Sequence, residues 1–405
     1  MFISLRAAGL FATLSLIFFH ITATTFASLG VVLPAMIDEL EWSWTEAGFG
    51  FTALALFTGV FSPIAAQSLK RLGLRGNYAL GGAVMASGFA MLSVTKGLAL
   101  YLAAASLLGA GFALLANVPS VYVAAQTVTD RARNTMIGVY LAGGGLGGVA
   151  GPLIANALLS QGADWRLYWQ LSLASILVLT LIFLAFADPQ FMRAGNAETH
   201  EPAPEGAQTP VRDWTVTEAL RAPAFYVIGG ALMAAYFCGV SVSSWAVTHL
   251  SGLGLSMGFA SAMLSLHAAS NALARAAGGF AVKFIRARYL LLTGLAAEAI
   301  GMLALAVASD PATAIIFALF EGYAFGMILF ATTVLQIEYF GLKNSPAILG
   351  AMNLFATVAM LGPVLTGVTG DVFGSFSPIF IAYGAIAAAL VIAGLFIHNP
   401  NERAQ

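Results

Sequence analysis

Long apolar stretches recur along the chain and are separated by short polar segments. A helix that crosses the bilayer needs about 20 predominantly apolar residues. The pattern predicts twelve such spans, at residues 9–37, 47–69, 77–94, 98–124, 134–159, 168–187, 225–249, 258–282, 289–308, 312–336, 347–370 and 378–397. The predicted fold class is therefore an all-α membrane protein with twelve transmembrane helices and both termini on one side.

The composition agrees with this prediction. Apolar residues make up 60% of the 405 residues and charged residues only 9%, whereas roughly a quarter of the residues in soluble domains are charged. The first apolar stretch is too long for a cleavable signal peptide, so we expect a retained first span.

The positions of the cations predict the orientation. With the N-terminus inside, the outer loops contain only Lys96 and Arg166. The cytoplasmic loops and ends then hold Arg6, Lys70, Arg71, Arg75, Arg131, Arg133, Arg193, Arg212, Arg221, Lys283, Arg286, Arg288, Lys343 and Arg403. This asymmetry follows the positive-inside rule and predicts a multi-pass protein of a bacterial inner (cytoplasmic) membrane with both termini in the cytoplasm.

A polar segment at residues 188–222 interrupts the apolar pattern after the sixth span. It divides the chain into an N-terminal bundle at 1–187 and a C-terminal bundle at 223–405. The segment is expected to be a cytoplasmic linker. Its end has the pattern of a capping box, with Thr215 followed by Glu218, and this predicts a short surface helix up to Arg221.

The two halves repeat weakly. A basic loop follows the second span at 70–75 (KRLGLR) and the eighth at 283–288 (KFIRAR), and a Gly-Pro pair lies in the fifth span and in the eleventh. With residues 62–75 (SPIAAQSLKRLGLR), 147–152 (GGVAGP) and 164–166 (DWR), the sequence resembles the major facilitator superfamily over its full length. The resemblance implies two pseudo-symmetric six-helix bundles that bind substrate near the membrane midplane.

Within that superfamily the chain looks most like the monocarboxylate and oxalate/formate porter branch. The resemblance rests on residues 271–275 (NALAR), 338–343 (EYFGLK) and 362–367 (GPVLTG). Branch members with a basic residue late in span one or in span eleven use it together with the arginine of span eight. Here Ser28 aligns with the first of these positions and span eleven has no Lys or Arg, so the expected substrate is a monocarboxylate.

Arg275 is the sharpest candidate because it is the only cation inside a predicted span. It lies about 10 Å into the membrane at 1.5 Å per residue, where a charge is costly. A guanidinium can clamp a carboxylate with two hydrogen bonds; the alternative is a structural ion pair or snorkelling to the inner surface. Asn271 and His267 lie on the same helix face, as substrate partners or as packing residues.

Glu321 lies near the middle of the tenth span. The resemblance implies that spans one, four, seven and ten line the cavity, where a carboxylate can bind and release a proton. Glu321 is therefore the first candidate for proton coupling; alternatively it holds helices together. Glu298, in the ninth span, is interpreted as a buried hydrogen-bonding group of a supporting helix.

Four further candidates rest on helix number or on proximity to Glu321. His20 in span one is a second proton-coupling candidate. The substrate-binding candidates are Asn117 in span four, Tyr236 in span seven and Tyr323 in span ten.

The glycine-rich run at 143–151 is not a nucleotide loop, because no strand precedes it and no Gly-Lys-Ser/Thr follows it. Small residues let membrane helices approach closely, and prolines bend them. The residues expected to serve packing or gating are Gly147, Gly151, Pro152, Gly362 and Pro363.

These observations predict a secondary transporter that moves a small organic monocarboxylate by alternating access, coupled to protons. Two alternatives stay open: a proton-coupled efflux pump for hydrophobic compounds, and a ligand receptor that does not transport. We expect no enzyme activity, no catalytic residues and no cofactor. The single cysteine, Cys238, cannot form a disulfide or a Cys-based metal site. The expected partners are a small organic anion, protons and the lipid bilayer, with no nucleic acid, and the expected state is a monomer.

Overall fold

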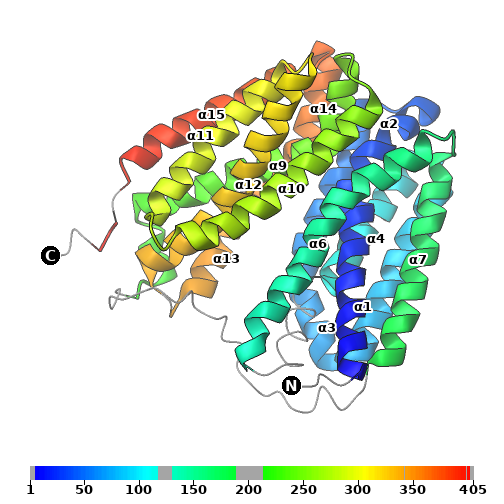
Figure 1. Cartoon of the computed structure of the whole chain (residues 1–405), viewed down its shortest axis with the longest axis horizontal. Helices are drawn as coiled ribbons and strands as arrows, with labels where there is room; N and C mark the ends of the chain where they lie inside the picture. Colours follow the sequence, from blue (N-terminus) through cyan, green and yellow to red (C-terminus); the bar gives the residue numbers. More distant parts are fainter. Residues whose placement is uncertain (1–4, 117–129, 188–212, 342, 398, 402–405) are drawn as a thin grey trace. The chain divides into compact units, whose positions relative to one another are not determined.

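The computed structural model of the chain describes residues 5–116, 130–187, 213–341, 343–397 and 399–401. Every regular element in these residues is a helix (Figure 1). The chain forms two compact units. The first comprises Met1–Ala197 with the short segments Ser243–Thr248 and Met257–Ser265, and the second comprises Glu198–Val242, His249–Ser256 and Leu266–Gln405.

The helices of the N-terminal part are α1 (Leu5–Thr22), η1 (Ala23–Ala27), α2 (Leu29–Leu40), α3 (Trp44–Ser93), α4 (Leu98–Leu115), α6 (Asp130–Leu159) and α7 (Trp165–Phe186). The first predicted span is continuous through α1, η1 and α2, and its middle part is a π-helix. The second and third predicted spans are joined in α3, which breaks at Gly73, where φ is 68°. Glycine reaches this conformation without a steric cost, so the chain can turn between the two spans.

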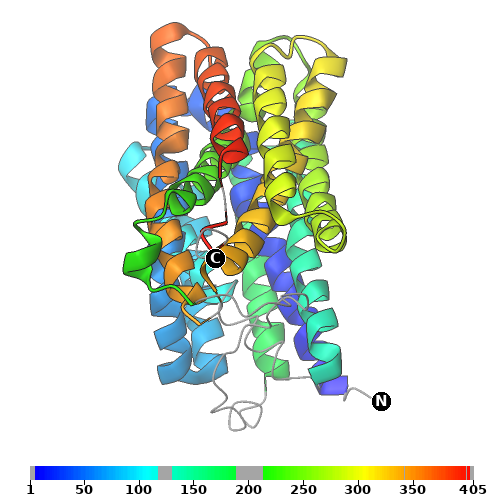
Figure 2. The same cartoon turned by 90° about the vertical axis from the view of Figure 1, so that its left-hand side faces the viewer.

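The helices of the C-terminal part are α8 (Val216–Ala219), α9 (Pro223–Gly252), α10 (Met257–Ala281), α11 (Ala287–Ala306), α12 (Pro311–Phe340), α13 (Ser345–Ala356), η3 (Thr357–Leu361), α14 (Gly362–Phe373) and α15 (Ser377–Leu395). Both predicted hydrogen bonds of the capping box between Thr215 and Glu218 are formed, and they start α8. Figure 2 shows the same helices from the side.

Ten helical segments of the described chain are long and apolar enough to cross a membrane. The predicted twelve spans are recovered when α3 is counted as two and α10 is added. Helix α10 is not among these ten because the three polar residues His267, Asn271 and Arg275 lower its hydropathy. The all-α membrane fold class is confirmed.

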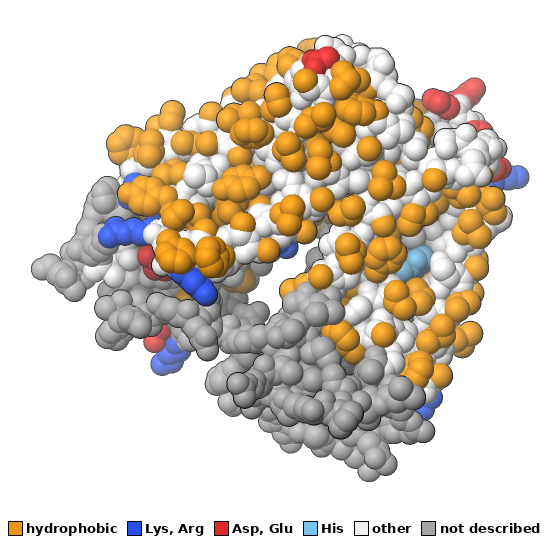
Figure 3. Space-filling view, viewed as in Figure 1, with side chains coloured by type: hydrophobic (Ala, Val, Ile, Leu, Met, Phe, Trp, Pro, Cys, Tyr) orange, Lys and Arg blue, Asp and Glu red, His pale blue; other side chains and the backbone are white. Residues whose placement is uncertain are grey.

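Apolar side chains cover much of the outer face of the helices (Figure 3), and others form the buried core. Leu181 of α7 is 67% exposed and Ile392 of α15 is 60% exposed. Isolated exposed apolar residues are ordinary in soluble proteins, but apolar faces along many helices are not. Lipid chains are the environment that these faces require.

Glycines bring α6 into direct backbone contact with the first span. A Cβ atom on Gly147 would lie 2.2 Å from the carbonyl oxygen of Phe19, and one on Gly151 would lie 2.5 Å from that of Ala23, in η1. Pro152 follows inside α6. Between α9 and α14, a Cβ on Gly362 would meet Ser241 Oγ at 2.7 Å, and Pro363 stands in the first turn of α14.

Gly147→Ala is expected to destabilise the protein by about 1–3 kcal/mol, the usual cost of overpacking, because the methyl group would overlap a backbone carbonyl that cannot move aside. The matched control is Gly59→Ala in α3, where nothing lies within 4 Å of the added Cβ. Alanine favours a helix over glycine, so this variant should unfold at the wild-type temperature or above it. Thermal unfolding of the purified proteins measures both changes, and equal melting temperatures for the two variants would contradict the packing role.

A charged cluster joins the end of α2 to the start of α7. The two terminal nitrogens of Arg166 donate to the two carboxylate oxygens of Glu39 at 2.6 and 2.9 Å, and Trp165 Nε1 donates to the same carboxylate at 2.7 Å. The Arg166 guanidinium also lies 4.1 Å from the centre of the Trp165 ring. The hydrogen bonds from Arg166 and then from Trp165 lower the pKa of Glu39.

Glu39→Gln is therefore expected to reduce thermal stability at neutral pH. Because the pKa of Glu39 is lowered in the folded protein, the contribution of its carboxylate is complete above the ordinary value of 4.5 and is lost as the pH falls through the lowered value. The difference in melting temperature between wild type and Glu39→Gln should thus disappear in acid. Glu41→Gln is the control, since the Glu41 side chain has no hydrogen bond or ion pair among the described residues; only its backbone N–H donates, to the carbonyl of Ile37. A difference that stays constant with pH would contradict the ion pair as its source.

Candidate functional site

The three polar residues of α10 lie along one face of the helix, as their spacing predicts. Arg275 and Asn271 are directly joined, because Arg275 Nε donates to Asn271 Oδ1 at 2.9 Å. His267 is one turn further along the same face and is only 6% exposed. The stripe therefore runs from the buried imidazole of His267 to Arg275, which is exposed as a whole residue.

Aromatic side chains border the guanidinium of Arg275. Its central carbon lies 5.9 Å from the centre of the Phe325 ring, which suits a cation–π contact. The hydroxyl of Tyr236 on α9 interacts with it electrostatically. Within the described residues, the two terminal nitrogens of Arg275 have no hydrogen-bond or ion-pair partner. Asn271 thus holds one edge of the guanidinium. The two terminal nitrogens, which a carboxylate would bind, stay available.

His267 and Glu321 form a buried pair between α10 and α12. His267 Nε2 contacts Glu321 Oε2, and Glu321 is completely buried. Gly322 allows the approach, since a Cβ at this position would lie 2.4 Å from the carbonyl oxygen of His267. A buried carboxylate is stable only when a partner compensates its charge. The pair can therefore exist as an ion pair, with the proton on the imidazole, or as two neutral groups, with the proton on the carboxyl group.

Phe325 connects the two polar pairs and was not predicted from the sequence. Its ring centre lies 6.5 Å from that of His267 and 6.4 Å from that of Tyr236. It is four residues after Glu321, so both side chains lie on one face of α12. This spacing was the signal that could have found it, but one phenylalanine among 29 does not stand out before its neighbours are known.

The other candidates occupy different places. Tyr323 lies beside Thr293 of α11, with its hydroxyl 2.9 Å from Thr293 Oγ1. His20 belongs to the first unit, where Nε2 is 3.4 Å from Ser175 Oγ of α7 and the ring stacks edge-on against Phe89 of α3 at 6.1 Å. Asn117 lies outside the described residues. The structure therefore brings together Arg275, Asn271, His267, Glu321 and Tyr236.

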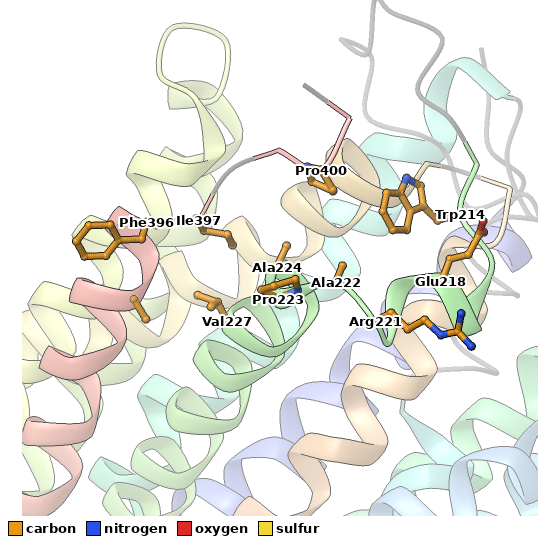
Figure 4. Close-up of a pocket in the computed structure, with 11 residues that line it drawn as sticks. Trp214, Glu218, Arg221, Ala222, Pro223, Ala224, Val227, Phe396, Ile397 and Pro400 are labelled. Atoms are coloured by element: carbon orange, nitrogen blue, oxygen red, sulfur yellow. The ribbon is translucent and has the colours of Figure 1, made fainter. Parts of the chain in front are cut away.

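A cavity of about 560 Å³ lies at another place in the second unit. Figure 4 shows Trp214, Arg221 and Phe396 around it, at the ends of α8, α9 and α15. Asn401 links Trp214 to α12. Trp214 Nε1 donates to Asn401 Oδ1 at 3.0 Å, and Asn401 Nδ2 donates to the carbonyl of Tyr339 at 2.9 Å. None of the residues predicted to bind substrate lines this cavity.

A sequence model of the Major Facilitator Superfamily matches residues 14–288, about two thirds of the chain. The chain belongs to this superfamily. It is a multi-pass membrane transporter of the major facilitator fold, and this family and fold are in general not those of enzymes. No curated protein sequence matches the chain.

Solved structures of other major facilitator transporters have the same fold. An inward-facing, unoccupied structure of a bacterial homologue of the human lysosomal transporter Spinster is 18% identical, with a TM-score of 0.68 over 97% of this chain and 94% of that one. A variant of the nucleoside transporter NupG is 14% identical, with a TM-score of 0.71 over 95% of this chain and 99% of that one. At these identities the likeness concerns the fold and leaves the substrate to be argued from the residues.

Proposed function

We propose that this major facilitator transporter carries a small organic monocarboxylate by alternating access and couples its movement to protons. Arg275 binds the carboxylate, and the pair of Glu321 and His267 exchanges the proton. The membrane is a bacterial inner membrane with both termini in the cytoplasm, as the distribution of Lys and Arg supports.

The observation that carries the proposal is the guanidinium of Arg275, oriented by Asn271 and bordered by Phe325. A planar guanidinium whose terminal nitrogens are available forms two parallel hydrogen bonds with a carboxylate. The aromatic side chains of Phe325 and Tyr236 offer an apolar surface to the rest of the ligand. No second Lys or Arg occurs in the described parts of the predicted spans, which favours one carboxylate over two.

Proton coupling is supported by the position of Glu321. It is completely buried and its partner, His267, is two helical turns from Arg275 on α10. A proton bound at this pair adds positive charge close to the anion site. Opposite charges attract more strongly in a medium of low polarity than in water, so proton binding and anion binding favour each other.

The test is stabilisation of the purified protein by a panel of aliphatic and aromatic carboxylates at low and neutral pH. We expect monocarboxylates to raise the melting temperature, more so at low pH, and Arg275→Ala to abolish the effect. Lys283→Ala, which removes an exposed cation just after α10, should respond like the wild type. Stabilisation by lipophilic amines or neutral compounds, and by no acid, would contradict the proposal and favour the efflux alternative.

A further inference from the structure

We propose that Glu298 of α11 is a second proton-binding residue, which shares protons with Glu321 so that the two carboxyl groups bind and release them as one unit. This inference deepens the proposed proton coupling and rests on it for its role in transport. The existence of the shared site can be tested without any substrate.

The two carboxyl groups are the only buried acidic side chains of the described chain. Glu298 is 1% exposed and Glu321 is 0% exposed. They lie on the neighbouring helices α11 and α12, which pack along their length (Figure 1). Gly301, one turn after Glu298, allows α11 to approach α12 closely at Glu321, because a Cβ there would lie 2.7 Å from the backbone nitrogen of Glu321.

Among the described residues, no cation and no strong donor contacts the carboxyl group of Glu298. Neither of its oxygens has an N–H or O–H partner within the described residues. On α9 the thiol of Cys238 faces the carboxyl group, and on α12 Glu321 interacts with it electrostatically. From α15 the hydroxyl of Tyr383 interacts with Cys238. His267 is the only imidazole in this cluster, and it contacts Glu321.

An isolated carboxylate in an apolar interior costs several kcal/mol, so a buried carboxyl group without a charged partner keeps its proton. Two carboxylates that interact electrostatically repel each other and cannot both ionise easily. Glu321 has His267 as a partner for its charge, whereas Glu298 has a thiol, which is a weak donor. The proton count of the cluster therefore depends on both carboxyl groups together, and each one influences proton release from the other.

Infrared spectroscopy of the substrate-free protein in vesicles tests the shared site across a pH titration. Protonated carboxyl groups have a C=O stretching band that is distinct from that of carboxylates. Above the pH at which the exposed carboxyl groups have lost their protons, we expect the remaining wild-type band to be lost in two steps. Glu298→Gln and Glu321→Gln should each leave a single step, at a pH that differs from both wild-type steps. If Glu321 loses its protonated C=O band at the same pH in wild type and in Glu298→Gln, the proposal is overturned.

The S–H stretching band gives a second measurement, which does not need Glu298 to be replaced. Cys238 is the only cysteine of the chain, so its band is unambiguous. Because the thiol faces Glu298, we expect its frequency to change at the pH of one of the two carboxyl steps and the change to be absent in Glu298→Gln. An S–H frequency that is independent of pH would contradict the proposed contact.

The transport readout separates this inference from the proposed function. If Glu298 shares the proton, Glu298→Gln should shift the pH at which uptake is half-maximal, and Glu298→Asp should restore the wild-type profile in part. If the infrared titration shows two carboxyl steps but uptake does not depend on pH, the shared site stands and proton coupling is rejected. If uptake depends on pH but Glu321 loses its proton in a single step that Glu298→Gln leaves unchanged, the shared site is rejected and proton coupling stands.

Discussion

Arg275→Ala is expected to lower the affinity for the monocarboxylate by roughly two to four orders of magnitude. Each hydrogen bond between charged groups contributes about 1.5–3 kcal/mol, and a tenfold change in affinity corresponds to about 1.4 kcal/mol. Two such bonds from the terminal nitrogens of Arg275 would be lost together. The dissociation constant of the purified variant, measured by the ligand concentration that gives half-maximal stabilisation, checks this value.

Arg275→Lys and Asn271→Ala separate charge from geometry. Lysine keeps the charge but cannot form two parallel bonds, so we expect intermediate affinity. Asn271→Ala keeps the guanidinium and removes only the hydrogen bond that orients it, at 2.9 Å; its affinity should fall less than that of Arg275→Ala. If both variants bind the ligand as tightly as the wild type, Arg275 is structural and the assignment of the anion site is wrong.

Glu321→Gln is expected to abolish accumulation of substrate against its gradient and to leave exchange of internal for external substrate intact. Glutamine keeps the shape of the side chain but cannot bind and release a proton. Exchange requires only that the loaded carrier reorients, whereas accumulation requires the proton to leave on the inner side. Uptake and counterflow in proteoliposomes measure the two processes separately.

The same assay on His267→Gln tests the partner. Without the imidazole, Glu321 loses the group that compensates its charge, and a buried carboxylate without a partner is strongly unfavourable. We expect this variant also to lose accumulation. Normal accumulation by Glu321→Gln would contradict the role of Glu321 in coupling, even if Arg275 is confirmed as the anion site.

The helices could be predicted from the sequence because the bilayer restricts both their length and their composition. The boundaries of α7, α9, α11 and α12 fall within a few residues of the predicted spans. The capping box at Thr215 could also be predicted from the sequence, since both of its hydrogen bonds join residues only three positions apart. The local sequence pattern did not predict the π-helical conformation of η1, where the first span contacts Gly151 of α6.

The candidate site was only partly predictable. The stripe of His267, Asn271 and Arg275 follows from helical periodicity, and the structure adds the hydrogen bond within it. The contact between His267 and Glu321 depends on how α10 and α12 are aligned, and a small residue, Gly322, decides that alignment. Sequence spacing carries no information on such contacts between helices. Glu298 is interpreted as a supporting residue from the sequence because the resemblance places span nine among the outer helices.

The most direct test of the account is accumulation of a monocarboxylate by proteoliposomes that contain the purified protein, driven only by an imposed pH gradient. We expect the substrate to accumulate when the outside is more acidic, a proton ionophore to abolish the accumulation, and Arg275→Ala and Glu321→Gln to show none. Accumulation that is unaffected by the pH gradient, or transport confined to lipophilic amines, would contradict proton-coupled monocarboxylate transport.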